Sequence, residues 1–166
     1  PLPTGVTYVQ VCASYEHTVL LRSDGKAVAC GGRDRPGKCA LPDLKDGMTY
    51  LQVSAGIDHT VLLRSDGRAI ACGGELHGQC SLPDLEKDVT YVQVAAGYEH
   101  TVLLRSDGSA VACGNNAVGQ CNLPDLPDEG GGVTYVQVSA GYEHTLLLQS
   151  DGLVSVCGAQ GEGQCT

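Results

Sequence analysis

The sequence predicts an all-β protein built from four tandem copies of one short repeat. The hexapeptide VTYVQV returns three times with small changes, so that its four copies stand at residues 6–11, 48–53, 89–94 and 133–138. Successive copies are 42, 41 and 44 residues apart, and the extra residues fall in loop-like segments such as Gly130-Gly131-Gly132. Loops tolerate such length changes, so the ordered part of a repeat has about 41 residues. We place the repeats of this single domain (1–166) at approximately 1–44, 45–85, 86–126 and 127–166.

Each repeat shows short strands separated by turn signals. The first strand is Thr-Tyr-Val-Gln-Val, whose alternating β-branched and aromatic residues suit a pleated surface. The second is His-Thr-Val-Leu-Leu-Arg, which ends at Ser-Asp-Gly, and Asp-Gly between apolar runs is a hairpin signal. The third is the apolar run 27–30 with its copies. A fourth, outer strand is predicted at Gly-Gln-Cys and Leu-Pro-Asp-Leu, because proline cannot donate to a sheet and favours an edge.

This unit is typical of a β-propeller, in which each repeat forms one blade. Four copies leave two architectures open, a closed four-bladed ring or an open arc of a larger propeller. The chain ends at Gln164-Cys165-Thr166 and begins with Leu2-Pro3, so the N-terminus could complete the last blade and lock a ring. The chain starts without Met, which predicts a processed or excised product.

The composition argues against several classes of function. A formal net charge of −9 disfavours non-specific binding to nucleic acid and to anionic membrane surfaces, and it favours a basic protein or peptide partner. No apolar run is long enough for insertion across a bilayer. The sequence also lacks a phosphate-binding glycine loop, a His-Glu-x-x-His helix and a nucleophile elbow. We therefore predict no cofactor and no enzymatic activity.

Histidines at one position of every copy invite a catalytic interpretation that their repetition contradicts. An active site needs one convergent set of different groups, whereas this position carries the same residue in each repeat. His77 lies outside the pattern, in a glycine-rich loop, and we expect its side chain to be solvated. The recurring histidines are expected to hydrogen-bond the backbone at an inner turn of each blade. They are His17, His59, His100 and His144.

Eight of the nine cysteines fall in pairs, one pair in each repeat, and Cys12 is left over. In an oxidising compartment the glycine-rich connection within a pair could bring the two β-carbons to bonding distance. Alternatively these are small buried apolar residues, which the odd count and the lack of a visible secretory feature favour. Because Cys-x-x-Cys spacing is absent, we predict no metal site. The pairs are Cys30/Cys39, Cys72/Cys80, Cys113/Cys121 and Cys157/Cys165.

These elements together resemble the regulator of chromosome condensation repeat. The resemblance covers essentially the whole chain and rests on AGYEHTVLLRSDG at residues 96–108, followed by Cys-Gly and Gly-Gln-Cys. It implies a β-propeller with one four-stranded blade per repeat, usually seven blades. This sequence departs from the family pattern because it has only four copies and each copy is shortened. It also has Cys at two positions, where the family usually has Trp before the Gly and Leu after Gly-Gln.

The two residues that precede each recurring histidine form the candidate binding site. They lie in the turn between the first and second strands, and the resemblance implies that these turns gather on one face where partners dock. Tyrosine offers contact area with a polar tip, and an acidic rim selects Lys or Arg on a partner. In the alternative, each Tyr packs beside its neighbouring blade and each acid is merely solvated. The predicted partner-binding residues are Tyr15, Glu16, Ile57, Asp58, Tyr98, Glu99, Tyr142 and Glu143.

The sequence thus predicts a protein-interaction scaffold, which binds a partner through one propeller face or serves as a subunit of a larger complex or homo-oligomer. One alternative is a disulfide-stapled extracellular or lumenal structural protein. Another, implied by the resemblance, is an exchange factor or regulator of a small GTPase.

Overall fold

The computed structural model describes residues 2–32, 37–45, 47–126, 132–159, 161, 163 and 164. Within these ranges the chain forms four three-stranded antiparallel sheets and no helix that could span a membrane. The strands are β1 (Tyr8–Ala13), β2 (His17–Arg22), β3 (Ala27–Gly31), β4 (Tyr50–Ala55), β5 (His59–Arg64), β6 (Ala69–Gly73), β7 (Tyr91–Ala96), β8 (His100–Arg105), β9 (Ala110–Gly114), β10 (Tyr135–Ala140), β11 (His144–Gln149) and β12 (Val154–Gly158).

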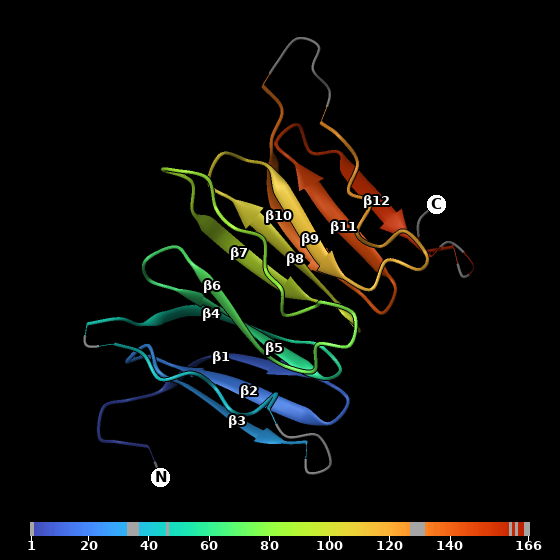
Figure 1. The fold of residues 1–166 in the computed structure, drawn as a ribbon. Helices are drawn as coiled ribbons and strands as arrows, with labels where there is room; N and C mark the ends of the chain where they lie inside the picture. Colours follow the sequence, from blue (N-terminus) through green and yellow to red (C-terminus); the bar gives the residue numbers. More distant parts are fainter. Residues whose placement is uncertain are drawn as a thin grey trace.

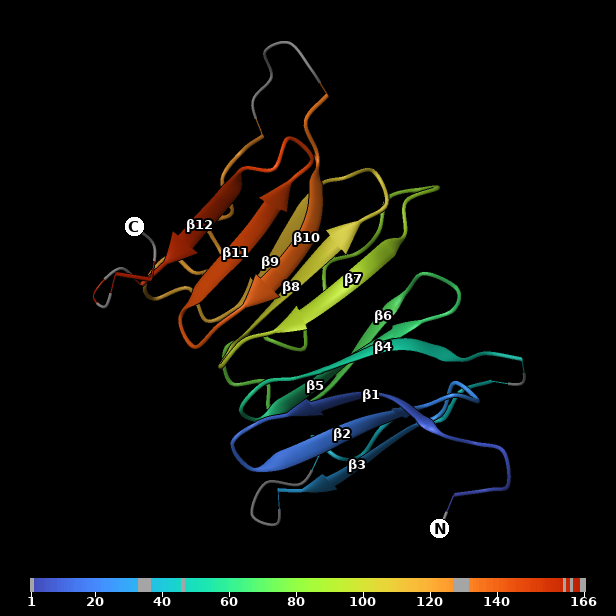
Figure 2. The same ribbon diagram turned by 180° about the vertical axis from the view of Figure 1, so that it is seen from behind.

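The four sheets stand side by side in a curved row (Figure 1). In each sheet the three strands follow their order in the sequence, and the first strands β1, β4, β7 and β10 contact one another from sheet to sheet. Figure 2 shows the first and fourth sheets at opposite ends of the row. The predicted all-β, propeller-type array is therefore confirmed, with its blades in an open arc. Cys165, beside which the N-terminus would lie if the predicted alternative of a ring were formed, lies outside the described residues.

Each blade has three strands, where the sequence predicted four. The Gly-Gln-Cys segments form turns, and the Leu-Pro-Asp-Leu segments run as coil along the sheet. The carbonyl group of each proline accepts a hydrogen bond from the tyrosine that begins the next blade, at 2.7 Å for Tyr50 and Pro42 and 2.5 Å for Tyr91 and Pro83. Proline has no amide hydrogen for a ladder, so this segment becomes a strap between blades instead of an edge strand.

The predicted Ser-Asp-Gly hairpins connect the second and third strands of each sheet. Gly25 has φ 75°, a conformation that glycine adopts without steric cost, and its amide donates to the Arg22 carbonyl oxygen at 3.0 Å. A β-carbon at Gly25 would lie 2.3 Å from the β-carbon of Thr49 in the next repeat. The glycine therefore serves both the turn and the close approach of the following blade.

The hydrophobic core is divided into three thin layers, one at each junction between adjacent sheets. In the first layer Val19 and Leu21 of β2 pack against Tyr50 and Val53 of β4. Tyr50 is only 4% exposed, whereas its counterpart Tyr8 is 45% exposed because no sheet lies in front of β1 in this arc. Stability therefore depends on neighbouring blades remaining in contact.

Glutamine side chains join the first strands of neighbouring sheets. The Gln10 amide nitrogen donates to the Val53 carbonyl oxygen at 3.0 Å, while the Val53 amide donates to Oε1 of Gln10 at 3.0 Å. Gln52 bonds Val94 in the same two ways, and Gln93 does so with Val138. One side chain thus satisfies two backbone groups of the adjacent blade, as a neighbouring strand would.

The recurring histidines also connect blades. Nε2 of His17 lies 2.9 Å from Oγ1 of Thr60 in the next sheet, and that hydroxyl donates to the Lys38 carbonyl oxygen at 2.7 Å. The same contact joins His59 to Thr101 and His100 to Thr145, each at 3.0 Å. The expected structural role therefore holds for these three rings, but the partner is a threonine hydroxyl instead of the backbone.

We predict that stability falls as the pH is lowered from about 6.5 to 4. Burial lowers the pKa values of His59 and His100 from 6.5 to about 4, with neighbouring histidines adding to the effect. Between these values the unfolded chain takes up protons that the folded chain refuses, so unfolding becomes more favourable as the pH falls. Over this pH range each ring should lower the free energy of unfolding by roughly 3 kcal/mol, at 1.36 kcal/mol per pKa unit.

Urea unfolding followed by circular dichroism across this pH range measures the effect. His100→Gln should flatten the dependence of the free energy of unfolding on pH. If the free energy of unfolding of His100→Gln fell with pH as steeply as that of the wild type, the role assigned to the buried His100 ring would be contradicted.

Candidate functional site

The turns between the first and second strands lie at the same end of every blade, and together they form a rim along one face of the arc. Each turn is closed by a backbone hydrogen bond, such as that from the Gly56 amide to the His59 carbonyl oxygen at 2.9 Å. Neighbouring turns are also linked, because the Ile57 amide donates to the Tyr98 carbonyl oxygen at 3.0 Å and the Tyr98 amide to Gly141 at 3.1 Å. The two variable residues of each repeat are thereby held at regular positions along this rim.

Seven of the eight residues predicted from the sequence line one pocket of about 410 Å³. A smaller hollow of about 200 Å³ shares its tyrosines and Ile57 and is completed by small residues of the same turns. Glu143 is half-buried and does not line the pocket. The lining residues are Tyr15, Glu16, Ile57, Asp58, Tyr98, Glu99 and Tyr142.

The tyrosines of the rim differ in their surroundings. The rings of Tyr98 and Tyr142 lie with their centroids 4.0 Å apart at an interplanar angle of 30°. A hydrogen bond with Tyr98 raises the pKa of Tyr142, helped by partial desolvation and by the nearby carboxylates. Tyr15, at the other end of the pocket, is 85% exposed. The rim therefore offers one stacked aromatic pair and one exposed ring.

Lys38 ties two of the predicted carboxylates together. Its Nζ lies 2.8 Å from Oε2 of Glu16 and 3.1 Å from Oδ1 of Asp58, and its side chain is fully buried. Burial alone would lower the pKa of Lys38, but hydrogen bonds to both carboxylates raise it above its ordinary value. Its ammonium group therefore offsets one of the two negative charges at this end of the pocket.

Sequence reasoning missed Lys38, although one signal was present. The second and third repeats have Gly-Gln-Cys where the first has Gly-Lys-Cys, and Gln79 and Gln120 are as buried as Lys38. A lysine replacing a recurrent buried glutamine needs a negative partner. The acidic turns supply it.

The remaining carboxylates have different partners. Nδ2 of Asn115 donates to Oε2 of Glu99 at 2.9 Å, and Nε2 of His77 lies 3.4 Å from the same oxygen. His77, expected to be simply solvated, therefore stands at the edge of the site. Glu143 forms no ion pair with another described residue.

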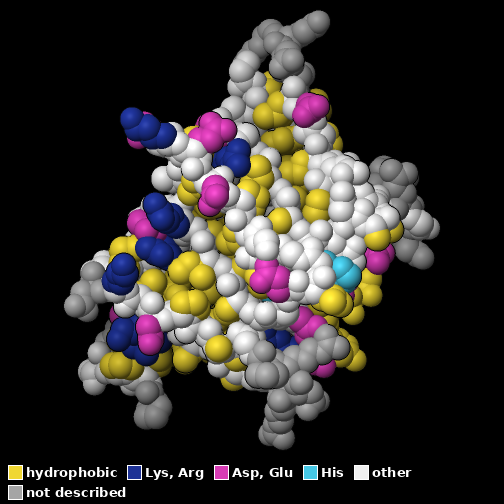
Figure 3. Space-filling model, in the orientation of Figure 1, with side chains coloured by type: hydrophobic (Ala, Val, Ile, Leu, Met, Phe, Trp, Pro, Cys, Tyr) yellow, Lys and Arg dark blue, Asp and Glu magenta, His cyan; other side chains and the backbone are white. Residues whose placement is uncertain are grey.

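Positive charges gather at the opposite end of the blades. Figure 3 shows the Lys and Arg side chains along the left-hand edge, over the Ser-Asp-Gly hairpins and the straps. In the described ranges Lys38 is the single cation on the side of the rim. The others are Arg22, Lys26, Lys45, Arg64, Arg68, Lys87 and Arg105. In the described ranges the rim therefore carries carboxylates with a single lysine among them, whereas the opposite end of the blades carries charges of both signs.

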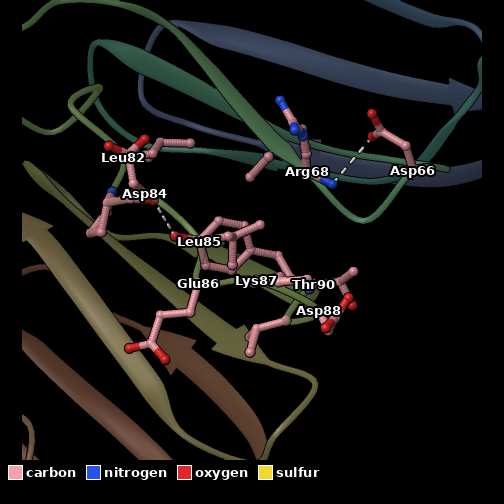
Figure 4. A pocket seen from close by; sticks show the side chains of 13 residues that line it. Asp66, Arg68, Leu82, Asp84, Leu85, Glu86, Lys87, Asp88 and Thr90 are labelled. Atoms are coloured by element: carbon pink, nitrogen blue, oxygen red, sulfur yellow. Dashed lines mark hydrogen bonds between the residues drawn. The ribbon is translucent and has the colours of Figure 1, made fainter.

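A larger hollow of about 760 Å³ lies at this opposite end, between a hairpin and the strap 82–90 (Figure 4). It carries charges of both signs, including Arg68 and Lys87 beside Asp66 and Asp84. The corresponding place in the first repeat has a similar hollow of about 330 Å³. The hollow therefore reflects how the straps pass the hairpins in each of these two repeats.

No disulfide bond joins any two of the eight described cysteines. Several donate to backbone carbonyl oxygens, for example Cys80 to Gly74 at 3.3 Å and Cys121 to Asn115 at 3.3 Å. Cys165, the predicted partner of Cys157, lies outside the described residues, and the four disulfides remain a prediction. The described residues contain no group of three or more His, Cys, Asp or Glu side chains that could hold a metal ion.

The recurring motif and the fold define a repeat protein of the propeller type. The Regulator of chromosome condensation (RCC1) repeat matches residues 51–79, 91–120 and 135–164, which is more than half of the chain. The chain therefore belongs to the RCC1 repeat family. No curated protein matches the chain significantly.

Solved structures share this fold. Prp20p from Saccharomyces cerevisiae superposes with a TM-score of 0.77 at 22% identity, covering 95% of this chain and 44% of Prp20p. Human WBSCR16 superposes with a TM-score of 0.75 at 21% identity, covering 95% of this chain and 50% of WBSCR16. The CRINKLY WD40 ectodomain of the Arabidopsis thaliana receptor kinase ACR4 superposes with a TM-score of 0.66 at 19% identity. The match covers 96% of this chain and 53% of the ectodomain. The chain thus spans about half the length of the proteins that it resembles.

We predict that Lys38→Ala lowers the free energy of unfolding by roughly 2 kcal/mol, because it removes the buried ammonium group that Glu16 and Asp58 share. The loss should be smaller than for a fully buried pair, since the Glu16 side chain is 41% exposed. Lys45→Ala removes the same charge from an exposed position and should change stability little. Urea unfolding compares the two variants, and equal losses would contradict the role of Lys38.

Alkylation at pH 8 should separate the thiols by burial. Burial raises the pKa values of Cys12, Cys72, Cys80 and Cys121 to about 11 and that of Cys113 to about 12. These residues should therefore react slowly with iodoacetamide in the native protein, because the thiolate is the nucleophile. Exposed Cys30 should react first. Mass spectrometry after unfolding without reductant should find nine labels, and a smaller number would establish disulfides.

Proposed function

We propose that this chain is a protein-interaction scaffold whose acidic, tyrosine-bearing rim binds a basic segment of a protein partner. The observation that supports this most directly is the pocket of about 410 Å³, where three tyrosines and three carboxylates from separate repeats come together. A lysine or arginine side chain fits such a setting, since it can pair with a carboxylate and lie over an aromatic ring.

The charge around the pocket favours the same kind of partner. Lys38 offsets one of the charges of Glu16 and Asp58, and Glu99 is held by the neutral amide of Asn115. The lining therefore keeps net negative charge, while most described cations lie at the other end of the blades. Long-range attraction should orient a basic partner toward the rim.

The solved structures support the coarser part of this proposal. Prp20p has binding properties toward Gsp1p and histones, and another structure holds the same yeast protein bound to Kap60. These partners belong to the yeast protein, and identities near 20% extend only the fold to this chain. The alternatives of a GTPase regulator and of a disulfide-stapled structural protein remain predictions.

We predict that Glu99→Lys weakens binding of lysine- and arginine-containing peptides at least tenfold, because it reverses a charge that lines the pocket. Glu143→Lys should have a smaller effect, since Glu143 stands outside the lining. Fluorescence anisotropy with labelled basic peptides, at low and high salt, measures both affinities.

Glu86→Lys makes the same change at the opposite end and serves as the control. Circular dichroism should show all three variants folded. Binding that is unchanged in Glu99→Lys, or that is equally strong for acidic peptides, would refute the proposed site.

A further inference from the structure

The described cysteines other than Cys12 form a row that crosses the junctions between blades. The first cysteine of each repeat lies on the third strand, and each described second cysteine lies in the turn that follows that strand. At a junction, the second cysteine of one repeat lies beside the first cysteine of the next. The three junction pairs, all within the described ranges, are Cys39/Cys72, Cys80/Cys113 and Cys121/Cys157.

One backbone carbonyl group positions the two cysteines of each pair. Sγ of Cys72 donates to the carbonyl oxygen of Lys38, at 3.9 Å, and this carbonyl belongs to the peptide bond that leads into Cys39. The same oxygen accepts the hydroxyl of Thr60 at 2.7 Å, and Thr60 lies opposite Cys72 in the sheet. The turn of one blade is therefore held against the third strand of the next. The corresponding contacts run from Cys113 to Gln79 at 3.8 Å and from Cys157 to Gln120 at 3.5 Å.

The thiols of a junction pair also influence each other electrostatically. Burial raises the pKa of Cys72 to about 11, and the Cys39 thiol adds to the rise. Burial likewise raises the pKa of Cys121 to about 11, with a further contribution from Cys157. A second titrating group acts in this way only at short range. All of these side chains are partly exposed, so a small ion can reach them from solvent.

Pairing within a repeat is the alternative arrangement. Sγ of Cys80 donates to the carbonyl oxygen of Gly74, which lies two residues after Cys72. The pKa of Cys113 is raised by burial first, then by Cys121 of its own repeat and then by Cys80. Each second cysteine thus stands between two first cysteines. The junction contact is the more direct one, because it reaches the peptide group of the partner cysteine itself.

Two neighbouring thiolates suit a soft monovalent cation. The predicted absence of a metal site concerned zinc, which needs four ligands, and the described ranges hold no cluster of three or more metal-binding side chains. Cu(I) prefers thiolate sulfur and is satisfied by two such ligands in a line. We propose that each junction pair binds one Cu(I) ion between its two sulfur atoms. Binding displaces two thiol protons and involves no oxidation or reduction.

An ion held in this way joins the third strand of one blade to the turn of the blade before it. It therefore adds a coordinate link at the junctions that already depend on histidine and glutamine side chains. The formal net charge of −9 attracts cations to the chain. None of the six ligands lines the rim pocket, so the metal sites go beyond the proposed function.

Native mass spectrometry of the reduced protein, loaded without oxygen from the Cu(I)–acetonitrile complex, counts the bound ions. The wild type should retain at least three Cu(I) ions and fewer Zn(II) ions under the same conditions. Cys12→Ser is the matched control, because Sγ of Cys12 donates to Val19 within its own sheet at 3.7 Å. This variant should retain as many Cu(I) ions as the wild type.

Double variants decide which thiols share an ion. Cys39→Ser combined with Cys72→Ser removes one junction pair and should lose one ion, as either single variant should. Cys72→Ser combined with Cys80→Ser breaks two junction pairs and should lose two. A serine hydroxyl can donate to the same carbonyl oxygens, and circular dichroism checks that each variant is folded.

Pairing within repeats would reverse the losses of the two double variants and would overturn the proposal. A wild type that retains no Cu(I), or that retains as many Zn(II) ions as Cu(I) ions, would overturn it too. So would the loss of an ion from the Cys12→Ser control.

Discussion

The hydrogen bond from a buried histidine ring to a threonine of the next blade constrains much of this structure. Because Oγ1 of Thr60 donates to the Lys38 carbonyl oxygen, it must accept a hydrogen from Nε2 of His17. Nε2 therefore carries a hydrogen, and Nδ1 is left buried without a hydrogen-bond partner, an arrangement that suits the neutral ring. The lowered pKa of His17, which burial causes first, is consistent with this state.

That ring also decides the shape of the rim. A β-carbon at Gly56 would lie 2.2 Å from Cε1 of His59, which favours glycine as the residue that opens the turn in the second, third and fourth repeats. In the first repeat it is Ser14, whose hydroxyl donates to the Gly56 carbonyl oxygen of the second turn. The residues between this position and the histidine are free to vary because the backbone on both sides is already fixed. A structural requirement thus fixes the positions of the variable side chains along the rim.

The parts of the fold that depend on local chemistry were predictable from the sequence. Asp24-Gly25 predicted a hairpin because its backbone conformation is a property of those two residues, and the strand pattern followed from alternation along each repeat. Pro42 was misplaced because a proline at an edge and a proline in a strap look alike in sequence. What distinguishes them is the Tyr50 hydroxyl, which comes from the following blade.

The candidate site was likewise predictable only where its features depend on the repeated sequence pattern. The family resemblance predicted that the Tyr and Glu turns gather on one face, and seven of the eight residues line one pocket. Two carboxylates of that pocket are bonded by Lys38 and Asn115, which reach it from loops sixteen or more residues away from their partners. Pairing of this kind is tertiary, so no pattern within one repeat reveals it.

The layered core has a consequence for how such a chain can change its length. Each layer is built by only two neighbouring blades, so the free energy of the array is close to a sum of blades and junctions. A duplicated blade meets on either side the surfaces that it already fits, and it needs no compensating substitutions elsewhere. Copy number can therefore vary by whole repeats in evolution, while the chemistry of the rim is adjusted two residues at a time.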